Sequence, residues 1–455
     1  MLKKSLRLRT LVAASAGLAL ASSVFTAAVQ VAGLSGMGLA WLAIAVGGAV
    51  CVLAAWNFSE LCAAFPNAGG VSVYVREAFG STLSLTVSLL YVVLAWAAGA
   101  AEAYVFATVL SVLFRGLPVL SQIPPIVWVL ATLGFFFVIN LRGVELAGRV
   151  QDLMTYTMFG VLLVVSLAAW LLPGTAAGGT GVGAGVGAGA AGAKAIAGVA
   201  PGFGSFLQAI AYSVYLFIGF EWITPLVEES EDRMFLPRAM PLAVAGLAVS
   251  YALFAEAMAT RVPLSQLAQS PTPHLLYGQA IGGNTGLLVL VAVSFLATFT
   301  SFNAGMMGTS RLVYAMAREG ALPPALSKVH LTYFTPWSAL LFMFLVEAVL
   351  SVVLIYTGQF TVPILLAAAI ESTIYALAAL AVLKLRKSQP GLERPYRAPG
   401  GAAQPVVTAV LFTALALGVL LPPTPVAVPV GFAIGLAGAW LYARFVAPRL
   451  AETSG

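Results

Sequence analysis

The chain has 455 residues, of which 61% are hydrophobic and only 8% are charged, and its formal net charge is +6. Soluble domains carry about 25% charged residues, so this composition excludes a soluble protein and predicts a chain embedded in a lipid bilayer. The positive charge does not indicate a nucleic-acid partner, because Lys and Arg collect in the connections between apolar segments.

Twelve apolar runs are each long enough for a transmembrane helix, which needs about 20 residues. The sequence therefore predicts an all-α membrane protein with twelve transmembrane helices. The predicted spans are 11–33, 39–63, 82–113, 124–141, 150–172, 204–228, 240–260, 285–310, 337–357, 362–384, 404–421 and 427–446.

The basic residues predict the orientation of these spans. Of the 22 Lys and Arg residues, only Arg115, Lys194 and Arg261 fall in connections on the predicted external side. This bias places both termini in the cytoplasm, with residues 1–10 and 447–455 as tails of a protein of the cell membrane. The first span has an alternative interpretation as a cleavable signal peptide, because a basic segment precedes a short apolar run.

Two connections are long on the external side. Residues 173–203 are nearly all Gly and Ala, which predicts a flexible external loop. The connection Arg261–Gly286 contains Pro and Ser. On the other side, 387–446 comprises a cytoplasmic loop and the last two helices, and no connection is long enough for a separate folded domain.

The sequence predicts no cofactor, no metal site and no enzymatic activity. Both histidines, His274 and His330, fall in polar connections, which leaves few metal ligands inside the spans. A nucleotide-binding loop of the Gly-x-x-x-x-Gly-Lys-Ser/Thr type is also missing.

Two apolar spans look interrupted. The segment Phe217–Pro225 contains Gly219, Glu221 and a proline, which weaken a helix where a carboxylate lies at membrane depth. The segment Ala21–Phe25 contains two serines and lies five spans earlier. This spacing is expected of two inverted five-helix repeats, whose broken helices form a site for a small molecule.

The chain resembles the amino acid–polyamine–organocation transporters over nearly its whole length. The resemblance is carried by Glu60-Leu61, Phe65–Gly70, Tyr74, Arg76–Gly80, Asn140–Val144, Gly148–Gln151, Gly219-Phe220-Glu221, Glu228-Glu229, Leu236–Ala239, Ser310-Arg311, Tyr314–Gly320, Pro323 and Arg394–Arg397.

The resemblance implies a leucine-transporter-type fold. Residues 11–172 and 204–386 would be the two inverted repeats, followed by two C-terminal helices. The substrate would bind at Ser22, Ser23, Gly219 and Phe220, and Tyr215 falls where arginine–agmatine exchangers carry a gating aromatic residue. The family usually has Gly-Ser-Gly-Ile-Phe at the first break, whereas this chain has Ala21-Ser22-Ser23-Val24-Phe25. A substrate that lacks the usual carboxylate is therefore conceivable.

Three acids within the spans are candidates for recognising a charged group of the substrate or for carrying protons. Alignment with the exchangers places Glu102 near the distal end of the substrate, where a carboxylate would pair with an amine or guanidinium. Glu221 matches a family glutamate, and Glu371 stands where a small residue is usual. Some proton-driven relatives carry a Lys in the fifth helix, but the aligned residue here is Met158.

A sodium site is a further possibility, with oxygens from Ser301 and Asn303 in the eighth span. The predicted function is secondary active transport of an amino acid or related amine by alternating access, proton-coupled or by exchange. The alternatives are a cation-selective channel or a uniporter for a small organic cation. The expected partners are this small-molecule substrate and the lipid bilayer.

Overall fold

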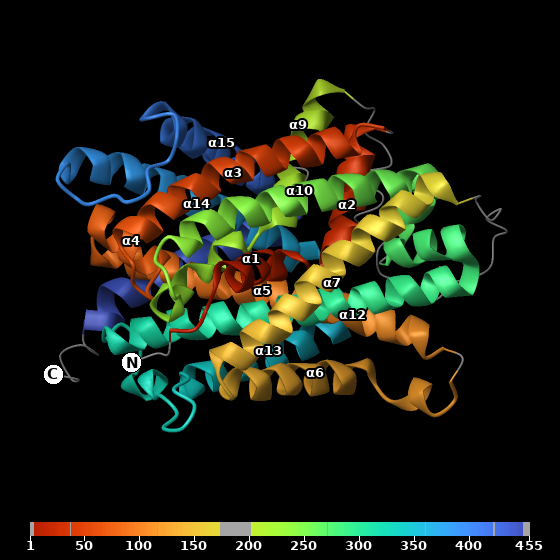
Figure 1. The fold of residues 1–455 in the computed structure, drawn as a ribbon, viewed down its shortest axis with the longest axis horizontal. Coiled ribbons are helices and arrows are strands. Elements are labelled where there is room, and N and C mark those ends of the chain that lie inside the picture. Colours follow the sequence, from red (N-terminus) through yellow and green to blue (C-terminus); the bar gives the residue numbers. More distant parts are fainter. Residues whose placement is uncertain are drawn as a thin grey trace.

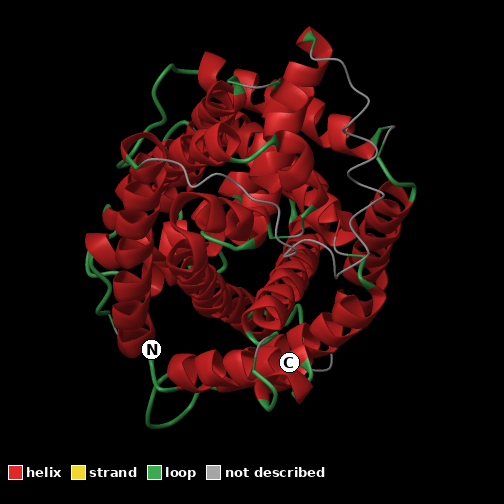
Figure 2. Ribbon diagram, turned by 90° about the vertical axis from the view of Figure 1, so that its right-hand side faces the viewer, coloured by secondary structure: helices red, strands yellow, loops and turns green. Residues whose placement is uncertain are grey.

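The computed structural model describes residues 4–36, 38–115, 117–172, 202–270, 272–359, 361–421 and 424–448. Most of the helices run along one common axis (Figure 1). The described chain is built of helices and loops (Figure 2), and its one β-bridge joins Leu6 to Ser230. The predicted all-helical class is confirmed. The stretch 173–201, which includes most of the predicted Gly/Ala loop, lies outside the described residues.

Ten helices among the described residues are long and apolar enough to cross a membrane. An eleventh candidate is the bent pair α1 (Leu8–Ala19) and α2 (Ser23–Ser35), and a shorter apolar helix is α6 (Pro125–Leu141). The ten are α3 (Ala40–Ala64), α5 (Ser81–Leu113), α7 (Val144–Leu171), α9 with η2 and η3 (Phe203–Ser213, Val214–Phe217 and Phe220–Glu229), α10 (Phe235–Arg261), α12 (Pro273–Arg318), α13 (Trp337–Thr357), α14 (Thr361–Ser388), α15 (Ala403–Leu420) and α16 with η5 (Ala427–Leu441 and Tyr442–Val446).

Four short helices connect these elements. They are α4 (Val71–Phe79), η1 (Leu120–Gln122), α11 (Leu264–Gln269) and η4 (Pro324–Ser327). The predicted external connection Arg261–Gly286 is largely helical, because it forms α11 and the first turns of α12. A kink at Gly282 and Gly283 separates these turns from the rest of the 46-residue α12.

Helix α7 begins at Val144, before the predicted start of the span at 150. Its first turns carry polar side chains that bond to other helices instead of facing lipid. Asp152 accepts hydrogen bonds from Arg9, and Gln151 accepts one from Asn303. Hydropathy alone therefore places the start of this helix too late.

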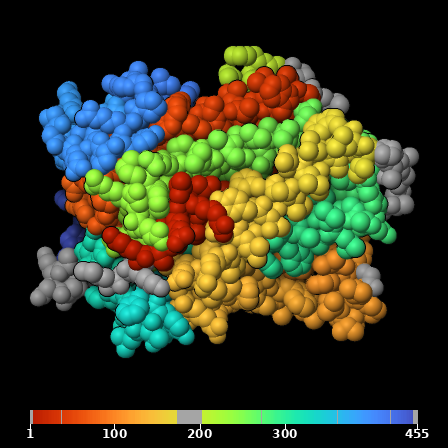
Figure 3. All heavy atoms as spheres, viewed as in Figure 1, coloured from red at the N-terminus to blue at the C-terminus, as the bar shows by residue number. Residues whose placement is uncertain are grey.

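Helix α1 lies at the centre of the bundle, against α7, α10 and α12. Small residues allow this close packing. A Cβ added at Gly17 would lie 1.8 Å from the Gln151 amide nitrogen. Figure 3 shows the N-terminal segment exposed between the α10 and α7 regions. Helix α1 therefore packs as part of the helical core.

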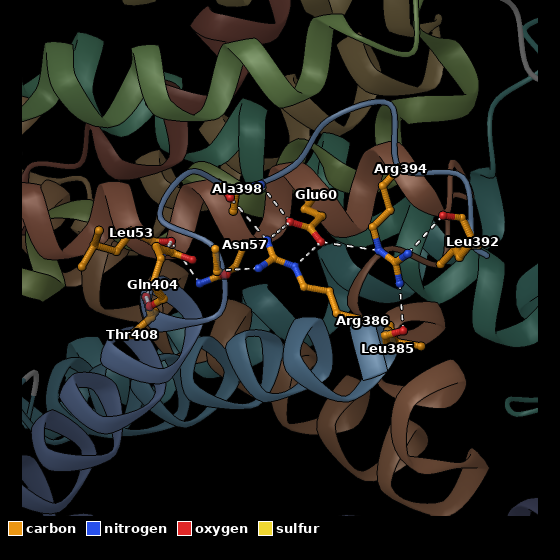
Figure 4. Close-up of polar contacts among 11 residues, drawn as sticks. Leu53, Asn57, Glu60, Leu385, Arg386, Leu392, Arg394, Ala398, Gln404 and Thr408 are labelled. Atoms are coloured by element: carbon orange, nitrogen blue, oxygen red, sulfur yellow. Dashed lines mark hydrogen bonds and ion pairs between the residues drawn. The ribbon is translucent and has the colours of Figure 1, made fainter. Parts of the chain in front are cut away.

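Both termini of the described chain lie at the same end of the bundle (Figure 1). Polar contacts stabilise the structure at this end. The Glu60 carboxylate, at the end of α3, bonds to both Arg386 and Arg394 and to the Ala398 N–H (Figure 4). These contacts attach the loop after α14 to α3. Glu60 and the Arg394–Arg397 segment, which both belong to the family pattern, are thus in contact in the structure.

Candidate functional site

The first predicted break is present. Helix α1 ends at Ala19, α2 begins at Ser23, and the two axes meet at 63°. The first N–H groups of a helix have no acceptor within that helix. The peptide N–H groups of Ser22 and Ser23 are therefore available to a partner outside α2.

The second break lies at Gly219, between η2 and η3. Its φ of +109° is a conformation that glycine adopts readily and other residues rarely do. A Cβ at this position would also lie 2.6 Å from a methyl group of Leu18, at the end of α1. Glycine is therefore required at this position by its positive φ and by the close approach of Leu18.

The two breaks contact each other directly. The Ser15 hydroxyl donates to the Phe220 carbonyl oxygen at 2.6 Å, and the Ser23 and Tyr215 hydroxyls are 3.2 Å apart. Leu18 and Gly219 complete the contact. The structure thus brings five predicted residues together in the buried core, namely Ser22, Ser23, Tyr215, Gly219 and Phe220.

Glu102, on α5, lies at the first break itself. Its Oε1 accepts the Ser22 N–H at 2.9 Å, and its Oε2 accepts the Ser23 N–H at 3.0 Å. The Thr298 hydroxyl donates to Oε1 at 2.5 Å. The Glu102 side chain is 1% exposed, and no Lys or Arg of the described chain forms an ion pair with it. The positive end of α2 supplies the favourable electrostatics instead.

A second buried acid cluster surrounds Glu221. The Tyr91 and Tyr375 hydroxyls each donate to the Glu221 carboxylate at 2.5 Å. Glu371, on α14, lies close enough to interact with Glu221, while neither of its oxygens accepts a well-formed hydrogen bond in the described chain. Two carboxyl groups without a cation repel each other when both are ionised.

The two residues of the predicted ion site point in different directions. The Ser301 hydroxyl donates to the Leu18 carbonyl oxygen at 3.2 Å, beside the first break. The Asn303 amide instead donates to the Ala147 carbonyl and to Gln151, at 3.0 and 2.8 Å. Thr300, which sequence reasoning missed, donates to the Leu20 carbonyl oxygen at 3.0 Å.

A small cavity of about 40 Å³ adjoins the breaks. Glu347 of α13 reaches it, and one of its carboxyl oxygens has no hydrogen-bond partner in the described chain. Glu347 was not among the candidate acids predicted from the sequence. The one sequence feature that could have pointed to Glu347 is its position as an acid within an apolar run. The lining also includes Leu18, Gly99, Trp222 and Ser301.

His274 is not in a polar connection, as the sequence had suggested. It lies in the first turn of α12, fully buried, with its ring against Phe25 and its Nε2 2.5 Å from the Ser294 hydroxyl. The described residues contain no group of three His, Cys, Asp or Glu side chains placed to hold a metal ion. This histidine is therefore a packing residue of the core.

Comparison with known proteins assigns the family. The family model for amino acid permeases matches residues 6–446. The chain is 28% identical to the human Asc-type amino acid transporter 1 over 407 residues, which cover 87% of this chain and 74% of that protein. It is 30% identical to the branched-chain amino acid permease BcaP of Bacillus subtilis over 252 residues, covering 53% and 51% of the two chains.

The fold is also similar to a solved transporter. The structure of Mhp1, a nucleobase-cation-symport-1 family transporter in a closed conformation, superimposes with a TM-score of 0.58. The match covers 99% of this chain and 94% of that one at 16% identity, so it concerns the fold alone. With the family model spanning nearly the whole sequence, this chain belongs to the amino acid permease family.

Proposed function

We propose that the protein is a secondary active transporter that moves an amino acid or related amine across the cytoplasmic membrane by alternating access. The observation that carries this proposal is the contact between the two helix breaks, where Leu18 packs on Gly219. Broken helices in contact near mid-membrane offer free N–H and carbonyl groups to a small polar ligand. The human and Bacillus relatives, an amino acid transporter and an amino acid permease by name, point the same way.

The proposed architecture has twelve spans. Residues 11–172 and 204–386 form two inverted five-helix repeats, and 387–446 adds a loop and two helices. The bent pair α1 and α2 and the shorter α6 complete this number. The distribution of Lys and Arg supports a cytoplasmic location for both termini.

The substrate site is proposed to comprise Ser22, Ser23, Gly219 and Phe220, with Tyr215 closing over the ligand. Tyr215 is well placed for this role because its hydroxyl is next to Ser23 across the two breaks. An aromatic ring can also contact a cationic group of the substrate.

Coupling is proposed to use protons or substrate exchange. Glu221 and Glu371 are both buried and close enough to interact, and two tyrosine hydroxyls donate to Glu221. Proton binding and release at such a pair changes its net charge. An unpaired charge in the membrane interior is costly in free energy, so protonation would affect the conformation of the protein. Sodium coupling would use the Thr300 and Ser301 hydroxyls with the carbonyls that end α1.

Counterflow in proteoliposomes tests the proposal. Unlabelled substrate inside the vesicles should stimulate uptake of labelled substrate, whereas a cation channel would conduct without saturation or such stimulation. Gly219→Ala should abolish counterflow because its Cβ would clash with Leu18. The matched control is Gly134→Ala, since a Cβ there meets nothing within 4 Å. A channel-like conductance in the unmodified protein would overturn the proposal.

A further inference from the structure

The start of α2 already holds a carboxylate that belongs to the chain. Glu102 binds there through both of its oxygens, one to the Ser22 N–H and one to the Ser23 N–H. The α-carboxylate of an amino acid would need the same kind of donors at this break. The side chain of Glu102 therefore makes the contacts that such a ligand group would make.

The surrounding hydroxyls complete this internal arrangement. Thr298 donates its hydroxyl to Glu102 Oε1. The Ser22 hydroxyl donates to the Ser294 carbonyl oxygen at 2.9 Å, so it turns towards α12. With Glu102 in this position, the two N–H groups at the break and the hydroxyls of Ser22 and Thr298 all donate to acceptors within the chain.

A second carboxylate at the same break would meet two costs. It would find both N–H groups engaged, and it would lie against the negative charge of Glu102 in a region of low dielectric constant. An amine meets neither cost. Its ammonium group would face Glu102 and the Tyr215 side chain, whose hydroxyl lies 3.2 Å from that of Ser23 at the same break.

We propose that Glu102 takes the place of the substrate carboxylate, and that the transported molecule is therefore an organic amine without an α-carboxylate. This inference rests on the proposed transport function and specifies its substrate class. Glu102 is then a specificity-determining residue, since its charge pairs with the amine and excludes the corresponding amino acid.

Pairs of ligands that differ only in the carboxylate provide the test. Suitable pairs are tyramine with tyrosine, isoamylamine with leucine, agmatine with arginine, and cadaverine with lysine. For the full purified chain, at least one amine should raise the apparent Tm and drive counterflow, with a Kd about tenfold or more below that of its amino acid.

The outcomes separate the two proposals. If an amino acid binds as tightly as its amine and shows counterflow, the substrate inference is wrong and the transport function stands. If none of the eight ligands shows counterflow, the transport proposal fails, and the inference falls with it.

A variant tests the role of Glu102 directly. Glu102→Ala frees both N–H groups for an external carboxylate, so the preference for the amine over its amino acid should fall by about tenfold or more. Ser111→Ala on the same helix is the control, because its hydroxyl bonds only to the Ala107 carbonyl of α5. An unchanged preference in Glu102→Ala would overturn the inference. If that variant does not fold, Glu102→Gln tests it too, because the amide NH2 that replaces one carboxylate oxygen is a donor and cannot accept the second N–H group.

Discussion

Two buried glutamates, Glu60 and Glu102, have similar exposure, 2% and 1%, but opposite surroundings. Glu60 is neutralised by two guanidinium groups, and its contacts hold the loop after α14 against α3 (Figure 4). Glu102 is held by peptide N–H groups and a hydroxyl, without an ion pair to any cation of the described chain. The contacts of Glu60 hold two segments of the chain together, whereas under our proposal the Glu102 carboxylate, bonded only to dipoles, stays available to a cationic ligand.

The largest expected effect is on stability, at Glu60. Glu60→Ala leaves Arg386 and the nearly buried Arg394 without their counter-charge, which typically costs about 3–5 kcal/mol. The variant should show a strongly lowered unfolding temperature in detergent. As the matched control, Glu393→Ala removes an exposed partner of Arg233 and should change stability by about 0.5 kcal/mol or less. Equal stability of the two variants would contradict a structural role for Glu60.

The next effect is on coupling, at Glu221. Glu221→Gln removes an ionisable group of the Glu221–Glu371 pair, so stimulation of uptake by an imposed pH gradient should be lost, a change of about 5- to 150-fold. Exchange at equal pH should persist. Glu231→Gln is the control because Glu231 forms an exposed pair with Arg7. Retained pH stimulation in Glu221→Gln would remove this acid from the coupling mechanism.

A smaller effect is expected from the hydroxyl that holds Glu102. Thr298→Val keeps the side-chain shape but removes a hydrogen bond to a charged group, worth about 1.5 kcal/mol. The preference for amine over amino acid should fall by roughly tenfold, as measured by ligand-dependent Tm. Thr373→Val, which loses only a bond to the Ala369 carbonyl of its own helix, should leave the preference as it was.

The smallest effect is expected at Ser301. If the acids carry the coupling proton, Ser301→Ala should change uptake by less than about twofold, because its bond to the Leu18 carbonyl is long. Uptake should also be equal in sodium and potassium buffers. A loss of sodium-stimulated uptake in this variant would instead establish a sodium site at the end of α1.

The positions of both breaks could be predicted from the sequence because their causes are local. Gly219 has the backbone freedom that the second break requires, and the serines at 22 and 23 mark the first. Their pairing followed from the five-span spacing between them, and the family resemblance implied the same fold. The all-helical class followed from composition, since only helices and closed barrels satisfy every backbone group in lipid.

The orientation of side chains across the bundle could not be predicted in this way. Alignment placed Glu102 near the distal end of the substrate. In the structure, the rotation of α5 about its own axis directs the Glu102 side chain to the beginning of α2. Asn303 is two residues from Ser301, so the two face different helices, because residues two apart do not share a helix face. The tyrosines around Glu221 come from α5 and α14, a meeting set by tertiary packing.

The bridge between Leu6 and Ser230 has a consequence for movement at that end of the bundle. Ser5 and Leu6 donate their N–H groups to the Glu229 carbonyl oxygen, and Leu6 accepts the Glu231 N–H. A displacement of α1 away from η3 must break these three bonds together, each worth about 0.5–1.5 kcal/mol. These bonds hold the segment before α1 against the end of η3, so we expect shortening this segment to lower the energy needed to separate the two.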